Sequence, residues 1–318
     1  MFFTEILIFW AISNRSLAVS REVPLPITLD DGSPEAFHAT YDKMSTGLDA
    51  TNIIPSNPLF ITCETTIFML SAYDVSTEQA RRNAILEVNQ QIILSGLCRG
   101  GFFDTAAFYG GTCLRIFHGL DRFSEDMDFS LLSPDDGYEF ERFFPAIVNE
   151  FAFLKDNTDM YDVTVRTEKN MKIKIEVDTR PPLKFDTEEK LLLQPTSFMT
   201  KCFTLPCLFA GKMRALVFRN WKNRVKGRDW YDFEWYVKNG VQLDFVYLQE
   251  RIREFNGKDM SKAGFMQLLR ERLSMTDMKS VKLDVEPFLK NKESLGIWSN
   301  DYFLQLADMI RFRYGRKR

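Results

Sequence analysis

The spacing of apolar residues in the first half of the chain predicts two amphipathic helices on either side of a glycine-rich stretch. After Ser76, apolar side chains recur every three or four residues, and Ser76 and Gln79 have the spacing of a capping box. Residues 99–101 (Arg-Gly-Gly) favour a helix end. A second run with helical periodicity covers residues 138–151. We expect both helices to pack against a central sheet.

Strict alternation of apolar and polar residues predicts a β-hairpin after the second helix. Residues 161–166 and 171–179 alternate, with Lys169-Asn170 as the turn between them. Because side chains alternate across a strand, Glu176 and Asp178 share the polar face of the second strand.

The remainder of the chain is mainly helical in its spacing. Short extended pieces are expected over residues 185–205, before Pro206. Helical periodicity then covers a run that begins near residue 208 and four later segments, residues 243–255, 261–273, 284–288 and 300–312.

These patterns predict an α+β fold, with a short mixed sheet flanked by helices and then a mostly helical C-terminal lobe. We place the core at residues 69–185 and the lobe at residues 186–318, with the lobe returning side chains to the core's active site. Residues 1–68 have a different character, because a short apolar start is followed by a segment that is rich in proline. We expect them to form a poorly ordered N-terminal extension.

Composition narrows the class of protein. The chain has 318 residues, 45% of them hydrophobic, and a formal net charge of -3, so any contact with nucleic acid must be a local patch. The apolar start is too short to cross a bilayer and lacks the basic flank of a secretory signal. Five cysteines without CxxC spacing and only two histidines make zinc sites and histidine triads poor candidates, and a reducing cytoplasm fits.

Candidate chemistry begins in residues 108–131, FYGGTCLRIFHGLDRFSEDMDFSL. Gly110 and Gly111 remove two side chains in a row, so the backbone can approach a ligand closely there. Thr112 follows them, and the helical run over residues 113–117 can direct its N–H groups towards an anion. A glycine pair by itself is most often only a turn.

Two carboxylates lie on one strand face at the end of the same stretch. Asp126 and Asp128 are two residues apart, so they share a face and repel each other unless a cation lies between them. Mg²⁺ suits such a pair, because it binds one or two carboxylates together with substrate phosphates. With Arg122 and Ser124 between the two parts, the order of residues favours phosphoryl or nucleotidyl transfer over a solvated strand face.

A second block concentrates positive charge. No acidic residue occurs between Lys201 and Arg228, and Lys212 lies on a predicted helix in this segment. A triphosphate or an RNA backbone is the natural partner of such a stretch. Asp229 and Asp232 follow at a spacing that places both on one helical face. From spacing alone, Asp229 is better explained as an acidic residue in the first turn of a helix, where the dipole or Arg228 satisfies it.

The sequence GGTCLRIFHGLDRFSEDMDF, with Lys212 and the later RDWYD, resembles the AbiEii/AbiGii family of bacterial nucleotidyltransferase toxins. This family belongs to the DNA polymerase β-type nucleotidyltransferase superfamily. The resemblance runs from about residue 69 to about residue 237 and continues more weakly to the C-terminus. It implies a nucleotidyltransferase core at residues 69–185 and a cytoplasmic enzyme of a toxin–antitoxin or abortive-infection system, with no membrane anchor.

The resemblance also implies roles for individual residues. Asp126 and Asp128 bind Mg²⁺ with a third carboxylate from a neighbouring strand, for which Glu176 is the first choice and Asp178 the second. Ser124, Lys212 and Asp229 match residues that the family needs for activity. The residues expected to bind the phosphates of a nucleoside triphosphate are Gly110, Gly111, Thr112, Arg122, Ser124 and Lys212.

The partners follow from the same resemblance. The acceptor of the nucleotide is expected to be RNA, with tRNA as one candidate, and an AbiEi-like antitoxin is expected to be encoded nearby. Two other functions remain open at this point. One is a housekeeping or resistance nucleotidyltransferase, and the other is a non-catalytic nucleotide-binding module, against which the intact Asp-x-Asp pair argues.

Overall fold

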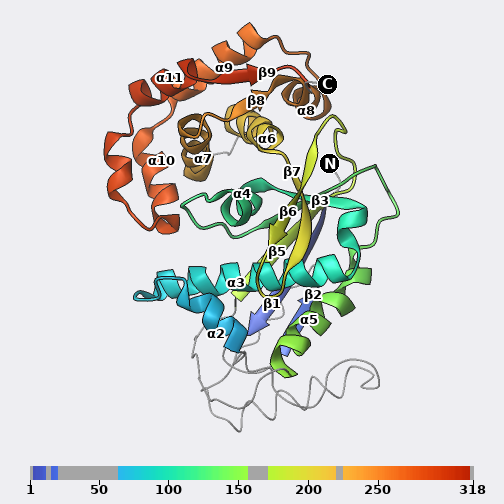
Figure 1. The fold of residues 1–318 in the computed structure, drawn as a ribbon. Coiled ribbons are helices and arrows are strands. Elements are labelled where there is room, and N and C mark those ends of the chain that lie inside the picture. The colour runs from blue at the N-terminus through green and yellow to red at the C-terminus, as the bar shows by residue number, and fades with distance from the viewer. Residues whose placement is uncertain (1–2, 12–15, 21–63, 157–170, 220–224, 316–318) are drawn as a thin grey trace.

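In the computed structural model, seven strands form one mixed sheet with helices around it (Figure 1). The structure describes residues 3–11, 16–20, 64–156, 171–219 and 225–315. The strand order is β2-β1-β5-β4-β3-β7-β6. The strands are β1 (Phe3–Ala11), β2 (Ser16–Ser20), β3 (Ala106–Tyr109), β4 (Met127–Leu131), β5 (Met171–Asp178), β6 (Thr187–Leu192) and β7 (Phe198–Phe203). The predicted α+β class is confirmed.

The sheet contains both parallel and antiparallel pairs. β4 runs parallel to β5 and β3 parallel to β7, whereas β3 and β4 are antiparallel, as are β6 and β7. β1 pairs with β5 in an antiparallel register, so an N-terminal segment extends the sheet beyond the predicted start of the core at residue 69. The division into domains stays a prediction. The first strand of the predicted hairpin, residues 161–166, lies outside the described residues.

Helices of the N-terminal half cover the sheet. They are α2 (Glu64–Ser71), α3 (Glu78–Arg99), α4 (Gly110–His118) and α5 (Phe144–Asp156), with 3-10 turns η1 (Phe102–Asp104) and η2 (Phe140–Phe143). α3 packs against α5 and β7, and α4 against β4. α3 begins one residue later than expected, because Thr77 rather than Ser76 accepts the hydrogen bond from the amide of Ala80.

The C-terminal half is mostly helical and lies above α4 in Figure 1. Its helices are α6 (Leu205–Phe218), α7 (Gly227–Lys238), α8 (Phe245–Asn256), α9 (Lys262–Met275), α10 (Met278–Val285) and α11 (Asn300–Asp308), with η3 (Glu286–Phe288) and η4 (Glu293–Ile297). The last predicted helix ends early, because residues 311–313 form β9 (Arg311–Arg313), which pairs with β8 (Gln242–Asp244). None of the helices in the described ranges combines the length and the apolar character that crossing a membrane requires.

One hydrophobic core joins the two halves. Tyr109 at the end of β3 stacks on Phe203 of β7, with ring centroids 5.2 Å apart. The ring of Phe203 in turn meets the edge of Tyr247 on α8 at 6.0 Å. Because buried aromatic contacts of this kind fix the relative positions of elements, α8 is held directly over this end of the sheet.

Candidate active site

A row of polar side chains crosses the middle of the sheet. Asp128 on β4 lies opposite Tyr109 of β3 and opposite Glu176 of β5. Residues paired in this way point to the same face of a sheet, so the three side chains are neighbours. Asp126 lies two residues before Asp128, just before β4 begins. The register therefore places Asp128 beside Glu176, with Asp126 two residues earlier in the chain. The carboxylate oxygens of these three predicted metal ligands do not all lie within 4.8 Å of one another.

The pKa of Asp128 is raised by burial and by its acidic neighbours. Burial raises it to about 7, with further contributions from the charges of Glu176 and Asp126, while Lys226 and Arg219 lower it. Asp128 is therefore difficult to ionise beside the other carboxylates. A bound cation would stabilise its ionised form, because the positive charge offsets the repulsion. This donor set fits a divalent metal ion that prefers oxygen ligands.

Asp178, the second choice for the third carboxylate, lies one step further along β5 and pairs with Ser130 rather than with Asp128. Its side chain is buried, and its Oδ1 accepts a hydrogen bond from the amide of Arg180. Glu176 is more exposed and its Oε1 lies 2.8 Å from Lys174 Nζ. The register therefore favours Glu176 as the partner of Asp128, in agreement with the order of preference from the sequence.

The glycine pair at the start of α4 is explained by the protein's own side chains. Gly110 has a φ of +82°, and a Cβ at this position would lie well under 3.0 Å from a carboxylate oxygen of Asp128. A Cβ on Gly111 would lie 2.9 Å from both Arg122 Nη2 and Ser124 Oγ. The two glycines thus allow α4 to begin directly against the acidic strand and the loop that precedes it.

The loop over residues 121–126 is held from several sides. Gln90 of α3 donates its Nε2 to the carbonyl oxygens of Ser124 (3.1 Å) and Glu125 (2.9 Å). Thr112, which is fully buried, donates its hydroxyl to the carbonyl of Asp126. Arg115 holds the start of the loop through the carbonyl of Asp121. In this arrangement Thr112 positions Asp126, and its predicted contact with phosphate stays a prediction.

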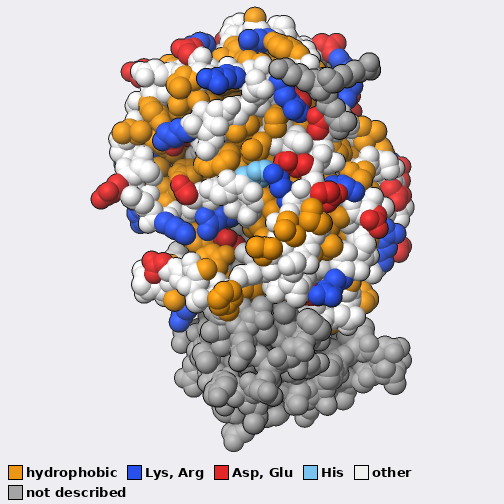
Figure 2. Space-filling model, viewed as in Figure 1, with side chains coloured by type: hydrophobic (Ala, Val, Ile, Leu, Met, Phe, Trp, Pro, Cys, Tyr) orange, Lys and Arg blue, Asp and Glu red, His pale blue; other side chains and the backbone are white. Residues whose placement is uncertain are grey.

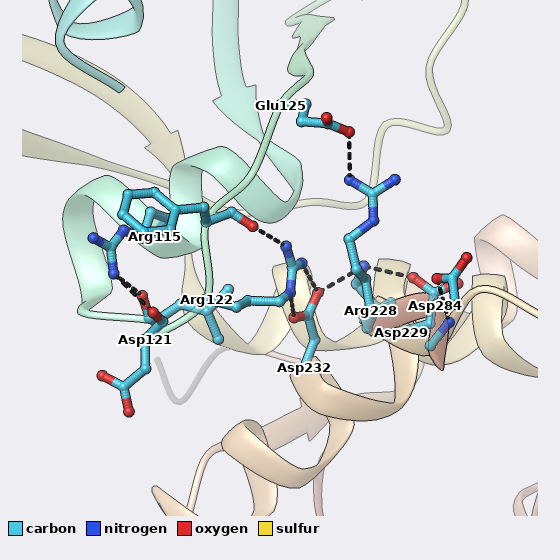
Figure 3. A network of polar contacts seen from close by, with 12 residues as sticks. Arg115, Asp121, Arg122, Glu125, Arg228, Asp229, Asp232 and Asp284 are labelled. Atoms are coloured by element: carbon cyan, nitrogen blue, oxygen red, sulfur yellow. Dashed lines mark hydrogen bonds and ion pairs between the residues drawn. The ribbon is translucent and has the colours of Figure 1, made fainter. Parts of the chain in front are cut away.

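A buried network of charges links this loop to the C-terminal helices (Figure 3). Arg122, which is 2% exposed, donates Nε and Nη2 to the two oxygens of Asp232, each at 2.6 Å. Lys212 Nζ lies 2.8 Å from Asp232 Oδ2 and 2.7 Å from Asp229 Oδ1. Burial opposes the ionisation of Asp232, but Arg122 and Lys212 outweigh it and hold its pKa below the usual value. Residues of the loop after α4, of α6 and of α7 therefore share one ionised cluster.

This network changes the interpretation of Arg122. Both edges of its guanidinium are engaged, since Nη1 also donates to the carbonyl of Phe123 at 2.9 Å. Arg122 therefore reaches the site through Asp232 and Lys212, and a direct contact with phosphate would require this pair to open. Lys212 and Asp229, both predicted to return from the C-terminal lobe to the site, are in direct contact, and Lys212 is only partly buried.

The sequence assigned no specific role to several residues of the site. Asp232 shares a helical face with Asp229, which was a usable signal, but its partner Arg122 is 110 positions away in the chain. Lys226 and Arg219 belong to the basic segment, and together with Lys212 they hold the pKa of Asp229 low against the effect of burial. Gln90 carries no sequence signal, because a glutamine on a helix is ordinarily solvated.

Among the residues that the structure describes, the potential metal ligands with donor atoms within 4.8 Å of one another are Asp186, Cys207 and Asp244. This group lies outside the polar row of the sheet. Arg313 of β9 already binds both acids, at 2.9 Å from Asp186 Oδ2 and 2.8 Å from Asp244 Oδ2. A guanidinium bound in this way supplies the positive charge that a metal ion would otherwise bring.

Comparisons with known proteins give one matching family and several similar solved structures. The family model described as nucleotidyl transferase AbiEii toxin, type IV TA system, matches residues 92–313. No curated protein matches the chain significantly. MenT4, a nucleotidyltransferase toxin from Mycobacterium tuberculosis H37Rv, is 16% identical over 76% of this chain and 93% of its own, with a TM-score of 0.46. JHP933 from Helicobacter pylori is 17% identical over 73% and 90%, with a TM-score of 0.41.

Proposed function

Because the chain belongs to the AbiEii family of nucleotidyltransferase toxins, we propose that it transfers a nucleoside monophosphate from a nucleoside triphosphate to RNA in a reaction that requires Mg²⁺. The observation that supports the site most strongly is the row across the sheet, where Asp128 lies beside Glu176 and close to Asp126. No other described part of the chain combines neighbouring carboxylates with a glycine-opened helix start and several cations.

Asp126, Asp128 and Glu176 would hold the divalent ion. When bound, Mg²⁺ would supply positive charge to the phosphate oxygens and to the attacking oxygen. The raised pKa of Asp128 supports this assignment, since the carboxylates destabilise one another in the absence of a cation.

The phosphates would lie at the start of α4. Gly110 and Gly111 allow this helix start to lie directly against Asp128 and Ser124, and Ser124 adds a hydroxyl. Lys212 supplies charge from α6, with Lys226 and Arg219 close by, as their effect on the pKa of Asp229 indicates. Thr112 and Arg122 act as positioning residues in this proposal, because the Thr112 hydroxyl and all three guanidinium nitrogens of Arg122 are engaged. The Lys212 ammonium has a third donor beyond its contacts with Asp229 and Asp232.

In the transfer step, the protein's main contribution is to orient the acceptor hydroxyl and the triphosphate relative to each other. An acceptor hydroxyl attacks the α-phosphorus, the bond from this phosphorus to the bridging oxygen of the β-phosphate breaks, and pyrophosphate leaves. Asp229 is poorly suited to take the hydroxyl proton, because Lys212 lies 2.7 Å away and its pKa is low. It is better placed to orient Lys212. The proton leaves to solvent in this scheme.

The biological setting follows from the family. We propose a cytoplasmic toxin whose acceptor is RNA, with tRNA as the leading candidate, and an AbiEi-like antitoxin encoded beside it. On the face seen in Figure 2, basic and acidic side chains are interspersed, so contact with RNA would depend on the local cations of the site.

The test is transfer of label from each α-labelled nucleoside triphosphate in the presence of Mg²⁺, with total cellular RNA present in one set of reactions and omitted from a second. We expect label in RNA with wild type and a decrease of this label by about a hundredfold or more with Asp126→Ala. Asp121→Ala is the matched control, because this acid is exposed on the same loop. Label in protein only, or equal labelling by Asp126→Ala, would contradict the proposal.

A further inference from the structure

Two arginines from different helices meet over one aromatic ring beside the candidate active site. The guanidinium carbon of Arg214 on α6 lies 4.5 Å from the centroid of Phe255, and that of Arg251 on α8 lies 5.1 Å from it. Arg251 is 9% exposed, and Arg214 is partly buried. The two positive charges are therefore close neighbours in a region of restricted solvent.

Neither arginine forms a close ion pair with a described carboxylate. Burial opposes the charge of Arg251, but interactions with Tyr247, Tyr109 and Asp178 outweigh it and raise its pKa. Arg251 Nη1 donates to Tyr247 Oη at 2.8 Å, and Arg251 Nε is buried without a hydrogen-bond partner. Arg214 makes two long contacts, of 3.3 and 3.4 Å, to the side-chain oxygen of Asn256. Within the described parts of the chain, no carboxylate oxygen lies within 4.0 Å of either guanidinium.

The charge of Arg214 is unfavourable in the absence of a ligand. A buried charge is normally paired, and like charges in a medium of low dielectric constant repel strongly. Burial, and then the charges of Arg251 and Arg219, lower the pKa of Arg214 to about 10. An unpaired guanidinium N–H in a buried region beside a second arginine is typical of an anion-binding site.

The position of the pair indicates which anion. The charge of Arg251 lowers the pKa of Asp178 and of Tyr109. Tyr109 lies opposite Asp128 in the polar row. Lys212 and Lys226 instead surround Asp229 at the start of α7. Arg219 lies between the two groups of cations, since its charge lowers the pKa of both Arg214 and Asp229. If the triphosphate binds at Lys212, the phosphates of the acceptor need cations of their own, which Arg214 and Arg251 can supply.

We propose that Arg214 and Arg251 form a phosphate-binding site for the backbone of the acceptor RNA. This inference rests on the proposed function for its choice of ligand. The arginine fork suits a phosphodiester, and Phe255 and Tyr247 keep both side chains in place through their rings. Tyr109, partly exposed beside the pair, offers an aromatic surface to a terminal base.

The test measures binding of a labelled, short single-stranded oligoribonucleotide by fluorescence anisotropy, with no nucleoside triphosphate present. We expect Arg251→Gln and Arg214→Gln each to weaken RNA binding by about ten- to a hundredfold. The slope of log K against log salt should fall by about 0.7 for each phosphate that a variant no longer neutralises. Arg253→Gln is the matched control, because this arginine lies on the same helix, is exposed and is paired with Asp259.

Two further measurements separate this site from other roles. Binding of the nucleoside triphosphate should stay unchanged in both variants. The melting temperature of ligand-free Arg214→Gln should not fall, because one of two like charges has been removed; Arg214 is the safer variant if Arg251→Gln does not fold. Weakened triphosphate binding with unchanged RNA binding would overturn the proposal, as would unchanged binding of both ligands.

Failure of the proposed function would look different. If wild type transfers no label yet binds RNA through these arginines, the anion site stands and the transferase assignment fails. If label enters protein and the arginine variants bind RNA as wild type does, the acceptor site proposed here is wrong, whatever the chemistry of the enzyme.

Discussion

Gly110 and Gly119 mark the two ends of α4, and both have positive φ angles, of 82° and 75°. Only Gly110 has a neighbour in the direction of a side chain, namely the carboxylate of Asp128, whereas Gly119 faces open space. Substitutions at these two glycines can therefore distinguish the cost of backbone strain, which both share, from the close approach to Asp128, which only Gly110 makes.

Gly110→Ala should therefore lower nucleotide transfer by about a hundredfold or more, because Asp128 must move to admit the methyl group. Gly119→Ala should reduce stability by about 1 kcal/mol through strain and retain activity within a few-fold. Initial rates and chemical denaturation of both variants check this pair. Equal decreases in activity would mean that strain, and not the contact with Asp128, explains the glycine.

The pKa of Asp128 leads to a prediction about pH. Its folded-state pKa, about 7, is above that of an unfolded aspartate, so the folded protein holds the extra proton between about pH 4 and pH 7. Stability of the metal-free protein should consequently fall as pH rises through this window. Asp128→Asn should remove this decrease and be more stable than wild type at pH 8, on the order of a few kcal/mol.

Denaturation of wild type and Asp128→Asn at pH 5 and pH 8, each with and without Mg²⁺, measures this effect. Added Mg²⁺ should stabilise wild type more at pH 8 than at pH 5, because the ion competes with the proton. If Asp128→Asn were less stable than wild type at pH 8 without metal, repulsion among these carboxylates would not destabilise the folded protein.

At this scale the sequence predicted that Asp128 and Glu176 lie on neighbouring strands, but it did not predict the contacts that hold the acidic loop in place. Asp126, Asp128 and Glu176 follow from alternation along strands and from the family resemblance. The engagement of Arg122 with Asp232 did not follow, because a contact across 110 positions depends on how α7 packs, and local spacing carries no information about that.

Among the elements, α10 has a direct bearing on the site. A Cβ on Gly227, the first residue of α7, would lie well under 3.0 Å from the carbonyl oxygen of Val281 on α10. The amide of Gly227 also donates to Asp284 Oδ2 at 2.8 Å. Since Asp229 follows two residues later, the docking of α10 sets the position of the site's second block.

Gly227→Ala should therefore separate α10 from α7, lower stability by about 1–3 kcal/mol and reduce transfer without any contact with substrate. Gly211→Ala, inside α6 beside Lys212, is the control, because nothing lies near its added methyl group. Alanine there should be neutral or stabilising by up to about 1 kcal/mol. Thermal unfolding and nucleotide-transfer rates of both variants test this prediction. If Gly227→Ala behaved like wild type, the docking of α10 would not position Asp229.

The buried ion pair between Arg122, in the loop of residues 121–126, and Asp232 of α7 should stabilise the folded protein. Asp232→Asn leaves Arg122 buried without its counter-charge, so we expect stability to fall by about 3–5 kcal/mol at neutral pH. Because the folded pKa of Asp232 is low, the difference should persist above pH 4 and vanish only as pH falls through that pKa.

Asp308→Asn provides the comparison, since its ion pair with Arg270 is exposed and should contribute no more than about 1 kcal/mol. Urea denaturation at pH 7 of both variants gives the two values. Similar small decreases would mean that the buried pair is replaceable and that Arg122 is not a structural anchor.

Some elements could not be placed from local pattern. The apolar run at residues 3–11 is a strand of the sheet, but its partner β5 begins more than 150 positions later, and short apolar runs do not reveal their partners. Likewise residues 311–313 follow a helical pattern yet pair with β8, because three residues are too few for periodicity to decide.

On the scale of the whole molecule, the site lies where the two halves of the chain meet. The sheet contributes Asp128 and Glu176, and the C-terminal helices contribute Lys212, Asp229 and Asp232. The aromatic contacts from Tyr109 through Phe203 to Tyr247 keep these parts together. The α+β class followed from alternating patterns in the sequence, whereas the seven-stranded order depends on contacts that only the folded chain contains.

The most direct test of this account is a calorimetric titration of Mn²⁺, as a stand-in for Mg²⁺, into wild type and two pairs of variants. We expect saturable binding in wild type that is abolished in Asp128→Asn and strongly weakened in Glu176→Gln. Binding should be unchanged in Asp186→Asn and Asp244→Asn, which alter the other acidic group. Binding that survives in Asp128→Asn and disappears in Asp186→Asn would contradict the assignment of the metal to the sheet.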